Sequence, residues 1–149
     1  MSTTLGDWYK YGWLVKHQTS KQEIGDLLAL ADHDLQTAQL PDLPADWRLK
    51  IAYNAALESA NAALAASGYR AEKAAQHYRI IQSLELTVGM SITVVNHLDA
   101  FRKKRNISNY DRPGTVSEVE ANEMLTIAQE VRSAVLNWLL TNKPYLLED

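Results

Sequence analysis

Apolar residues recur along most of the chain at spacings of three and four positions, which is the period of one face of an α-helix. The first such stretch follows Ser20, and Glu23 stands three positions later, as in a helix-capping box. Its apolar positions are Ile24, Leu27, Leu28, Ala31, Leu35 and Ala38. Pro41 and Pro44 lie beyond it, where proline prevents the helix from continuing. The pattern predicts a helix from Ser20 to shortly before Pro41.

Three further segments show the helical period, namely the alanine-rich residues 47–67, then 71–84 and 91–108. Gly68 follows the first of them, at the place where a helix often ends in a left-handed residue. Residues 86–95 are rich in Val, Thr and Ile, so a strand is the rival interpretation there. An isolated strand among helices would have no hydrogen-bonding partner. We therefore expect helices in all three segments.

The last periodic segment begins with a second capping box, formed by Ser117 and Glu120. It follows a turn-forming stretch, residues 111–114, and Pro144 ends it. Its apolar stripe consists of Met124, Ile127, Ala128, Val131, Ala134, Val135, Trp138 and Leu139. This pattern predicts one long helix between the turn and Pro144.

These helices have short connections, which is typical of an antiparallel bundle around one core. We predict an all-α fold, an up-and-down bundle of four to five helices formed by residues 20–143, with residues 144–149 as a tail. Residues 1–19 are expected to form an N-terminal arm or short helix. This arm carries Trp8, Tyr9 and Trp13. Packing across the bundle is the favoured interpretation of these aromatic residues, and covering a partner chain is the alternative.

Composition supports a single globular domain, since the chain has 149 residues of which 46% are hydrophobic and 22% charged. Cysteine is absent, which excludes disulfides and thiolate metal sites. No apolar run approaches the roughly 20 residues of a membrane helix, and residues 1–10 lack the layout of a signal peptide. We expect a cytoplasmic protein without membrane attachment. The formal net charge of −3 argues against nucleic-acid binding by the whole surface.

The common catalytic signatures are missing from the sequence: there is no glycine-rich phosphate loop, GxSxG elbow, HExxH motif or EF-hand loop. The four histidines are scattered singly, at His17, His33, His77 and His97. A zinc site requires ligands paired at short spacing, and no such pair occurs. The sequence therefore predicts neither a metal site nor a cofactor.

One basic block, residues 102–105, stands out from the acidic balance. Four polar residues of the helix that contains it form one stripe, at positions i, i+3, i+4 and i+7: Arg102, Arg105, Asn106 and Asn109. Arginine and asparagine together can bind a phosphate and hydrogen-bond a base. Lys103 and Lys104 project to other sides and would attract an RNA backbone. The alternative is a helix end whose cations complement the macrodipole, an effect of about 0.3–1 kcal/mol.

This basic block is also the basis of a family resemblance. The pair Arg105 and Asn106, near the end of a long bundle helix and just before the turn at Asp111, resembles the motif of the HEPN superfamily. Residues 46–57 and 65–70 are similar to a bacterial branch of small stand-alone HEPN proteins. The resemblance extends over roughly residues 20–138.

The resemblance implies specific chemistry, because many HEPN proteins are metal-independent endoribonucleases, often toxins or defence effectors. They work as dimers whose motif helices face each other. Their motif is Arg, a polar residue, three to five further residues and then His. Arg105 and Asn106 match it, whereas Tyr110 occupies the histidine position. A phenol titrates near pH 10, so only about one in a thousand is ionised at pH 7 and Tyr110 would be a poor general base.

Three hypotheses follow. The favoured one is an HEPN-like homodimer that binds RNA, a nucleotide or a partner protein such as a nucleotidyltransferase through the basic face, without efficient catalysis. The alternative is a metal-independent endoribonuclease that uses Arg105, Asn106 and Tyr110. The third is a structural dimerisation module, in which the arginine stripe forms salt bridges at the interface.

Overall fold

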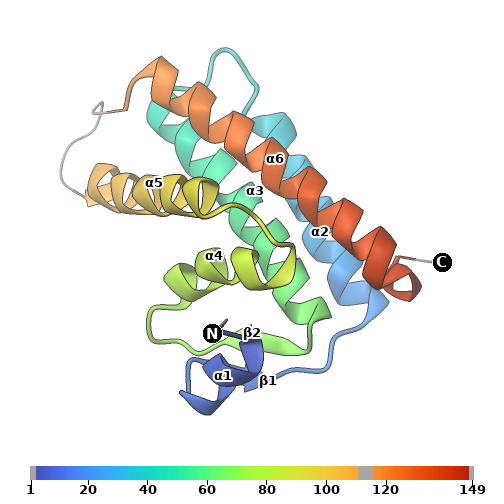
Figure 1. Ribbon diagram of the computed structural model, residues 1–149. Helices are drawn as coiled ribbons and strands as arrows, with labels where there is room; N and C mark the ends of the chain where they lie inside the picture. The colour runs from blue at the N-terminus through green and yellow to red at the C-terminus, as the bar shows by residue number, and fades with distance from the viewer. Residues whose placement is uncertain (1–2, 111–115, 148–149) are drawn as a thin grey trace.

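Residues 3–110 and 116–147 are described by the computed structural model, and for residues 106–110 the description is limited to the backbone. In these ranges the chain forms six α-helices, a two-stranded sheet and a 3-10 turn (Figure 1). The elements are α1 (Leu5–Lys10), β1 (Leu14–Lys16), α2 (Lys21–Thr37), α3 (Ala45–Ala66), β2 (Tyr69–Ala71), α4 (Gln76–Thr87), α5 (Ile92–Tyr110), α6 (Glu118–Asn142) and η1 (Pro144–Leu146). The prediction of an all-α helical bundle is confirmed.

Helix α3 is the central element and packs against α2, α6, α4 and α5 (Figure 1). Its buried face is mostly alanine, and the small side chains let neighbouring helices approach closely. The buried residues of α3 are Leu49, Ala52, Tyr53, Ala55, Ala56, Ser59, Ala60, Ala62, Ala63, Leu64, Ala65 and Ala66. Tyr53 is the largest of them, and it lies where α3 meets the first turn of α4 and the basic part of α5.

The two predicted serine caps begin α2 and α6. Ser20 Oγ accepts a hydrogen bond from Glu23 N at 3.1 Å, and Ser117 Oγ accepts one from Glu120 N at 3.1 Å. At Ser117 the capping box is complete, because the Ser117 N–H donates to Glu120 Oε1 at 3.0 Å. The box predicted at Ser20 is only half formed, since the Glu23 carboxylate instead accepts a hydrogen bond from the Thr19 hydroxyl at 2.6 Å.

The two strands were not predicted from the sequence. Strand β1 pairs antiparallel with β2, with Leu14 opposite Ala71. Gly68, at φ +93°, follows the end of α3 and turns the chain into β2. Ala71, the first residue of the helix expected over 71–84, belongs to β2 instead, and after a connection over residues 72–75 α4 begins later, at Gln76. The rejection of a strand over 86–95 holds, since α4 extends to Thr87 and α5 begins at Ile92.

The N-terminal segment packs on the bundle. Thr4 and Asp7 form a complete capping box at the start of α1. Trp8 is only 7% exposed and Leu14 is buried, so both belong to the core, whereas Tyr11 is 59% exposed. The segment therefore buries one set of side chains and leaves aromatic surface in contact with solvent.

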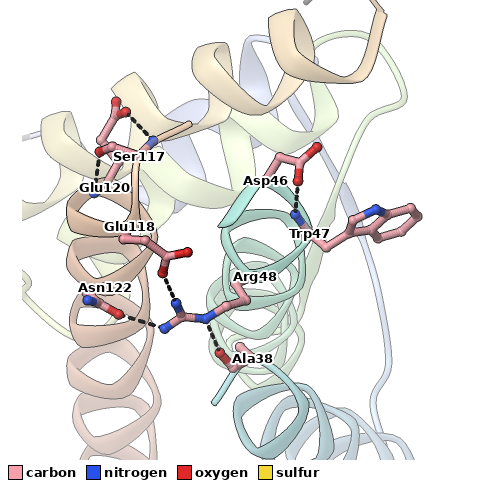
Figure 2. A network of polar contacts seen from close by, with 8 residues as sticks. All are labelled: Ala38, Asp46, Trp47, Arg48, Ser117, Glu118, Glu120 and Asn122. Atoms are coloured by element: carbon pink, nitrogen blue, oxygen red, sulfur yellow. Dashed lines mark hydrogen bonds and ion pairs between the residues drawn. The ribbon is translucent and has the colours of Figure 1, made fainter. Parts of the chain in front are cut away.

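Arg48 joins three helices at the end of the bundle where α6 begins (Figure 2). Its Nε donates to the carbonyl oxygen of Ala38, after the end of α2, at 3.0 Å. Its Nη1 donates to Glu118 at 2.5 Å and its Nη2 to Asn122 at 2.6 Å, both on α6. Because Arg48 itself belongs to α3, these contacts hold the start of α6 beside α3.

Candidate functional site

The basic residues of α5 do not all face the same way. Arg102 and Arg105 are partly buried against α3 and α4, whereas Lys103 is exposed. Lys104 lies on the α6 side, with its Nζ 3.3 Å from Glu120 Oε2. The spacing therefore predicted correctly that the two arginines share a face and that the two lysines leave it.

Asp99 orients Arg102. The Arg102 Nε donates to Asp99 Oδ1 at 2.7 Å, and Asp99 is only 9% exposed. The Lys103 ammonium is 3.7 Å from the other oxygen of this carboxylate. Toward the neighbouring helix α4, the Arg102 Cζ lies 5.6 Å from the centre of the Tyr78 ring. A guanidinium held by one carboxylate and one ring face keeps further N–H groups available to an anion.

Arg105 lies over Tyr53 of α3, with Cζ 5.4 Å from the ring centre. Tyr53 is fully buried, and its hydroxyl is 3.3 Å from Nδ1 of His77. Burial raises the pKa of Tyr53 to about 12, although the nearby charges of Arg105 and Arg102 act in the opposite direction. The Tyr53 hydroxyl therefore stays protonated at neutral pH and acts as a hydrogen-bonding group.

His77 is the second residue of α4 and is partly buried. Burial lowers its pKa, and the positive charges of Arg105 and Arg102 lower it further. A neutral imidazole has one nitrogen that accepts a proton and one that donates a hydrogen bond. The structure thus places a neutral histidine beside the two arginines of the predicted stripe.

The sequence alone did not distinguish His77 from the other three histidines, which are scattered singly along the chain. The relevant signal is weak: His77 directly precedes Tyr78 and Arg79, so it opens a short aromatic and basic run. His97, eight residues before Arg105, does not join the cluster. It is about half exposed, stacks on Phe101 with ring centres 5.0 Å apart, and lies 3.7 Å from Glu123.

Three predicted site residues lie outside the described side chains. The backbone of α5 extends through Asn106, Asn109 and Tyr110, but the structure describes none of their side chains. The observed cluster therefore consists of Arg102 and Arg105 from the prediction, together with side chains that the sequence did not single out. These are Tyr53, His77, Tyr78 and Asp99.

A small pocket of about 180 Å³ lies on the α2 side of His77. Its polar lining includes Glu58, Asn61 and Gln76. Burial raises the pKa of Glu58 to about 8, and a hydrogen bond to Asp34 together with the charge of that carboxylate raises it as well. Glu58 is thus mostly protonated at neutral pH and does not place a full negative charge beside the cluster.

This arrangement combines two guanidinium groups, a protonated phenol and a neutral imidazole, which is a set of groups suited to an oxyanion such as a phosphate diester.

No group of three or more histidine, aspartate or glutamate side chains in the described ranges is arranged to hold a metal ion. Within the same ranges no helix has the length and apolarity needed to cross a membrane. Comparison of the chain with protein-family models and with curated proteins finds no match.

Proposed function

We propose that this protein is an HEPN-like module that binds RNA, holding a backbone phosphate with Arg102 and Arg105 of α5 beside Tyr53 and His77. One observation carries the proposal: packing of α3, α4 and α5 brings two arginines of the same helix face together with a hydroxyl and an imidazole. Guanidinium groups bind phosphate oxygens in planar, charge-assisted pairs, and the neutral groups add hydrogen bonds.

The charge balance of this face supports an anionic ligand, although the whole chain is acidic. Asp99 offsets one of the positive charges, and Lys104 is paired with Glu120. The Asp99 carboxylate lies beside both Arg102 and Lys103, so two positive charges share one negative charge there. A local positive field of this kind attracts a polyanion to one face of a protein whose net charge is negative.

The resemblance to HEPN proteins supports the same proposal, because their motif arginine corresponds to Arg105 and their motif helix to α5. It also implies a homodimer in which the α5 helices of two copies face each other. A nucleotidyltransferase-type partner belongs to the same set of expectations. In the dimer the two basic faces would be neighbours, which would strengthen binding to a single RNA strand.

Fluorescence anisotropy with a labelled single-stranded RNA tests the proposal. We expect Arg102→Gln and Arg105→Gln each to raise the Kd by about tenfold and to lower the slope of log Kd against log salt by about one. The matched control is Lys21→Gln, which removes one exposed positive charge at the start of α2. If the arginine variants bind as well as this control, the proposal is wrong. Competition by a mononucleotide at equal concentration would point to a nucleotide rather than RNA as the ligand.

A second candidate function, metal-independent RNA cleavage, is favoured by the neutral His77 beside both arginines. In this reaction the imidazole accepts the proton of the 2′-hydroxyl, and the 2′ oxygen forms a bond to phosphorus. The bond between phosphorus and the 5′ oxygen breaks, and the leaving oxygen takes a proton from an acid. The motif of the resemblance has histidine at the position of Tyr110, whose phenol can donate this proton, while Asn106 beside Arg105 orients the phosphate.

Incubation of RNA in the presence of EDTA separates the two functions. Cleavage predicts products that end in a 2′,3′-cyclic phosphate, loss of these products with His77→Gln and Arg105→Ala, and faster cleavage with Tyr110→His. RNA that stays intact with wild-type protein at low salt excludes the nuclease and leaves the binding function. Cleavage that persists in His77→Gln excludes His77 as the base.

A further inference from the structure

A cluster of aromatic rings and one arginine lies where the N-terminal segment meets α4. The rings of Trp8 and Trp13 meet edge to face with centres 5.8 Å apart, and Tyr11 lies 4.9 Å from Trp13. Trp8 belongs to the core, Trp13 is partly buried, and Tyr11 is exposed. One side of the cluster is therefore part of the core, and its outer edge is aromatic surface exposed to solvent.

Arg79 of α4 lies at the centre of this cluster. Its Cζ is 3.6 Å from the centre of the Trp13 ring and 5.3 Å from that of Tyr78. No carboxylate of the described residues pairs with Arg79, so its neighbours are ring faces and its positive charge is not neutralised by an ion pair. This charge adds to the positive field that begins at Arg102.

The cluster continues directly into the proposed phosphate site. Tyr78 is the link, because both Arg79 and Arg102 lie near its ring, with Cζ at 5.3 Å and 5.6 Å from the ring centre. Cations and rings thus alternate from Arg102 through Tyr78 and Arg79 to Trp13. Figure 1 shows the elements that carry them, α5, α4 and the N-terminal segment, following one another along the same side of the molecule.

The outer edge of the cluster borders a cavity of about 720 Å³, a size within the range of small-ligand sites. Trp8, Tyr11 and Trp13 supply aromatic walls, while Gln82 and Glu85 of α4 supply an amide and a carboxylate. Aromatic faces stack on nucleobases, and amide and carboxylate groups hydrogen-bond the edges of bases. A carboxylate in the wall disfavours a phosphate inside the cavity, so the cavity suits the base rather than the backbone.

We infer that this cavity is a nucleobase subsite for the RNA strand whose phosphate is held by Arg102 and Arg105. The inference rests on the proposed function and adds the class of substrate, since a subsite of this kind requires an unpaired, unstacked base. The strand would run from α5 over Tyr78 and Arg79, with one base stacked against Tyr11 and Trp13. Single-stranded RNA is therefore the preferred ligand over a duplex, whose bases are stacked and paired.

Two probes of the same length test the inference: a single-stranded RNA of about 12 nucleotides and an abasic ribose-phosphate chain. We expect Tyr11→Ala to raise the Kd for the RNA by about tenfold, the loss typical of one stacked base, and to leave the Kd for the abasic chain unchanged. Gln82→Ala should act in the same direction. Tyr145→Ala is the matched control, because Tyr145 is exposed to a similar extent in η1, outside the cavity lining.

Each outcome bears on one of the two proposals. If Tyr11→Ala binds RNA like the Tyr145→Ala control, or loses RNA and the abasic chain equally, the subsite is overturned while the phosphate site stands. If Arg102→Gln leaves both probes bound but Tyr11→Ala weakens the RNA alone, the phosphate site is overturned and the subsite stands. Quenching of tryptophan fluorescence by the RNA and not by the abasic chain, in a Trp47→Phe, Trp138→Phe background, would confirm stacking at Trp8 or Trp13 directly.

Discussion

Replacing Glu58 by glutamine should change how the stability of the protein depends on pH. Glu58 of α3 faces Asp34 of α2. Burial raises its pKa from 4.5 to about 8, and the hydrogen bond and negative charge of Asp34 act in the same direction. Its Oε1 is buried without a hydrogen-bond partner among the described residues. Glutamine keeps the shape of the side chain and can donate to Asp34, but it has no proton to lose.

The direction of this pH dependence follows from the pKa of Glu58 in the unfolded and in the folded protein. In the unfolded chain Glu58 titrates near 4.5, whereas in the folded protein it holds its proton up to about pH 8. The stability that this proton contributes is therefore complete below the lower value, declines between the two, and is lost above the upper one. At about 1.36 kcal/mol per pH unit the interval corresponds to roughly 5 kcal/mol, an upper bound. Because Glu58 is partly exposed and water screens its charge, we expect about 2 kcal/mol.

Urea unfolding followed by circular dichroism at about pH 5, 7 and 9 measures this effect. The free energy of unfolding of the wild type should fall by about 2 kcal/mol relative to Glu58→Gln between the lowest and highest pH. Glu130→Gln, an exposed substitution on α6, is the control and should follow the wild type. Parallel curves for the wild type and Glu58→Gln across this range would refute the assignment of a protonated Glu58.

Three further predictions concern the fold and the site. Arg48→Met removes the contacts shown in Figure 2 and should lower the free energy of unfolding by about 2 kcal/mol, which is a fall in Tm of about 4–8 °C in a thermal scan; an unchanged Tm would contradict it. Gly68→Ala should cost about 1 kcal/mol in urea unfolding because φ is +93° there, whereas Gly25→Ala, in the second turn of α2 with open space around it, should stabilise by about 0.5–1 kcal/mol. Burial raises the pKa of Tyr53 from 10 to about 12, so the stability that its proton contributes is complete below pH 10 and is lost as the pH rises toward and through 12. Tyr53→Phe should therefore lose less stability than the wild type between about pH 9 and 11. Equal losses would argue against a buried, protonated phenol.

Local sequence signals were sufficient for most helix ends. Ser20 and Ser117 begin α2 and α6 because a side-chain oxygen accepts a backbone N–H only three residues away. Gly68 follows the end of α3 because the turn requires a left-handed backbone, which costs glycine little. The same kind of reasoning placed Arg102 and Arg105 on one face of α5, since residues three apart on a helix are neighbours.

Contacts between distant segments could not be predicted in this way. Strand β1 forms only because β2 lies beside it, and the two are separated in the sequence by α2 and α3. A three-residue strand has too short a pattern to be identified without its partner. Ala71 belongs to β2 because it pairs with Leu14, and α4 begins only at Gln76, after the connection over residues 72–75.

For the candidate site, too, the sequence predicted the local helix geometry but not the contacts between distant segments. The sequence by itself determined that a basic stripe lies on one face of a long helix, because that depends on helical geometry alone. Only the tertiary structure decided what this stripe faces: α3 brings Tyr53, and α4 brings His77 and Tyr78. It also decided the protonation states at neutral pH: burial and the arginine charges keep His77 neutral, whereas burial keeps Tyr53 protonated against the effect of those charges. Burial and through-space charge depend on neighbours distant in the sequence, so these properties exist only after the helices have packed.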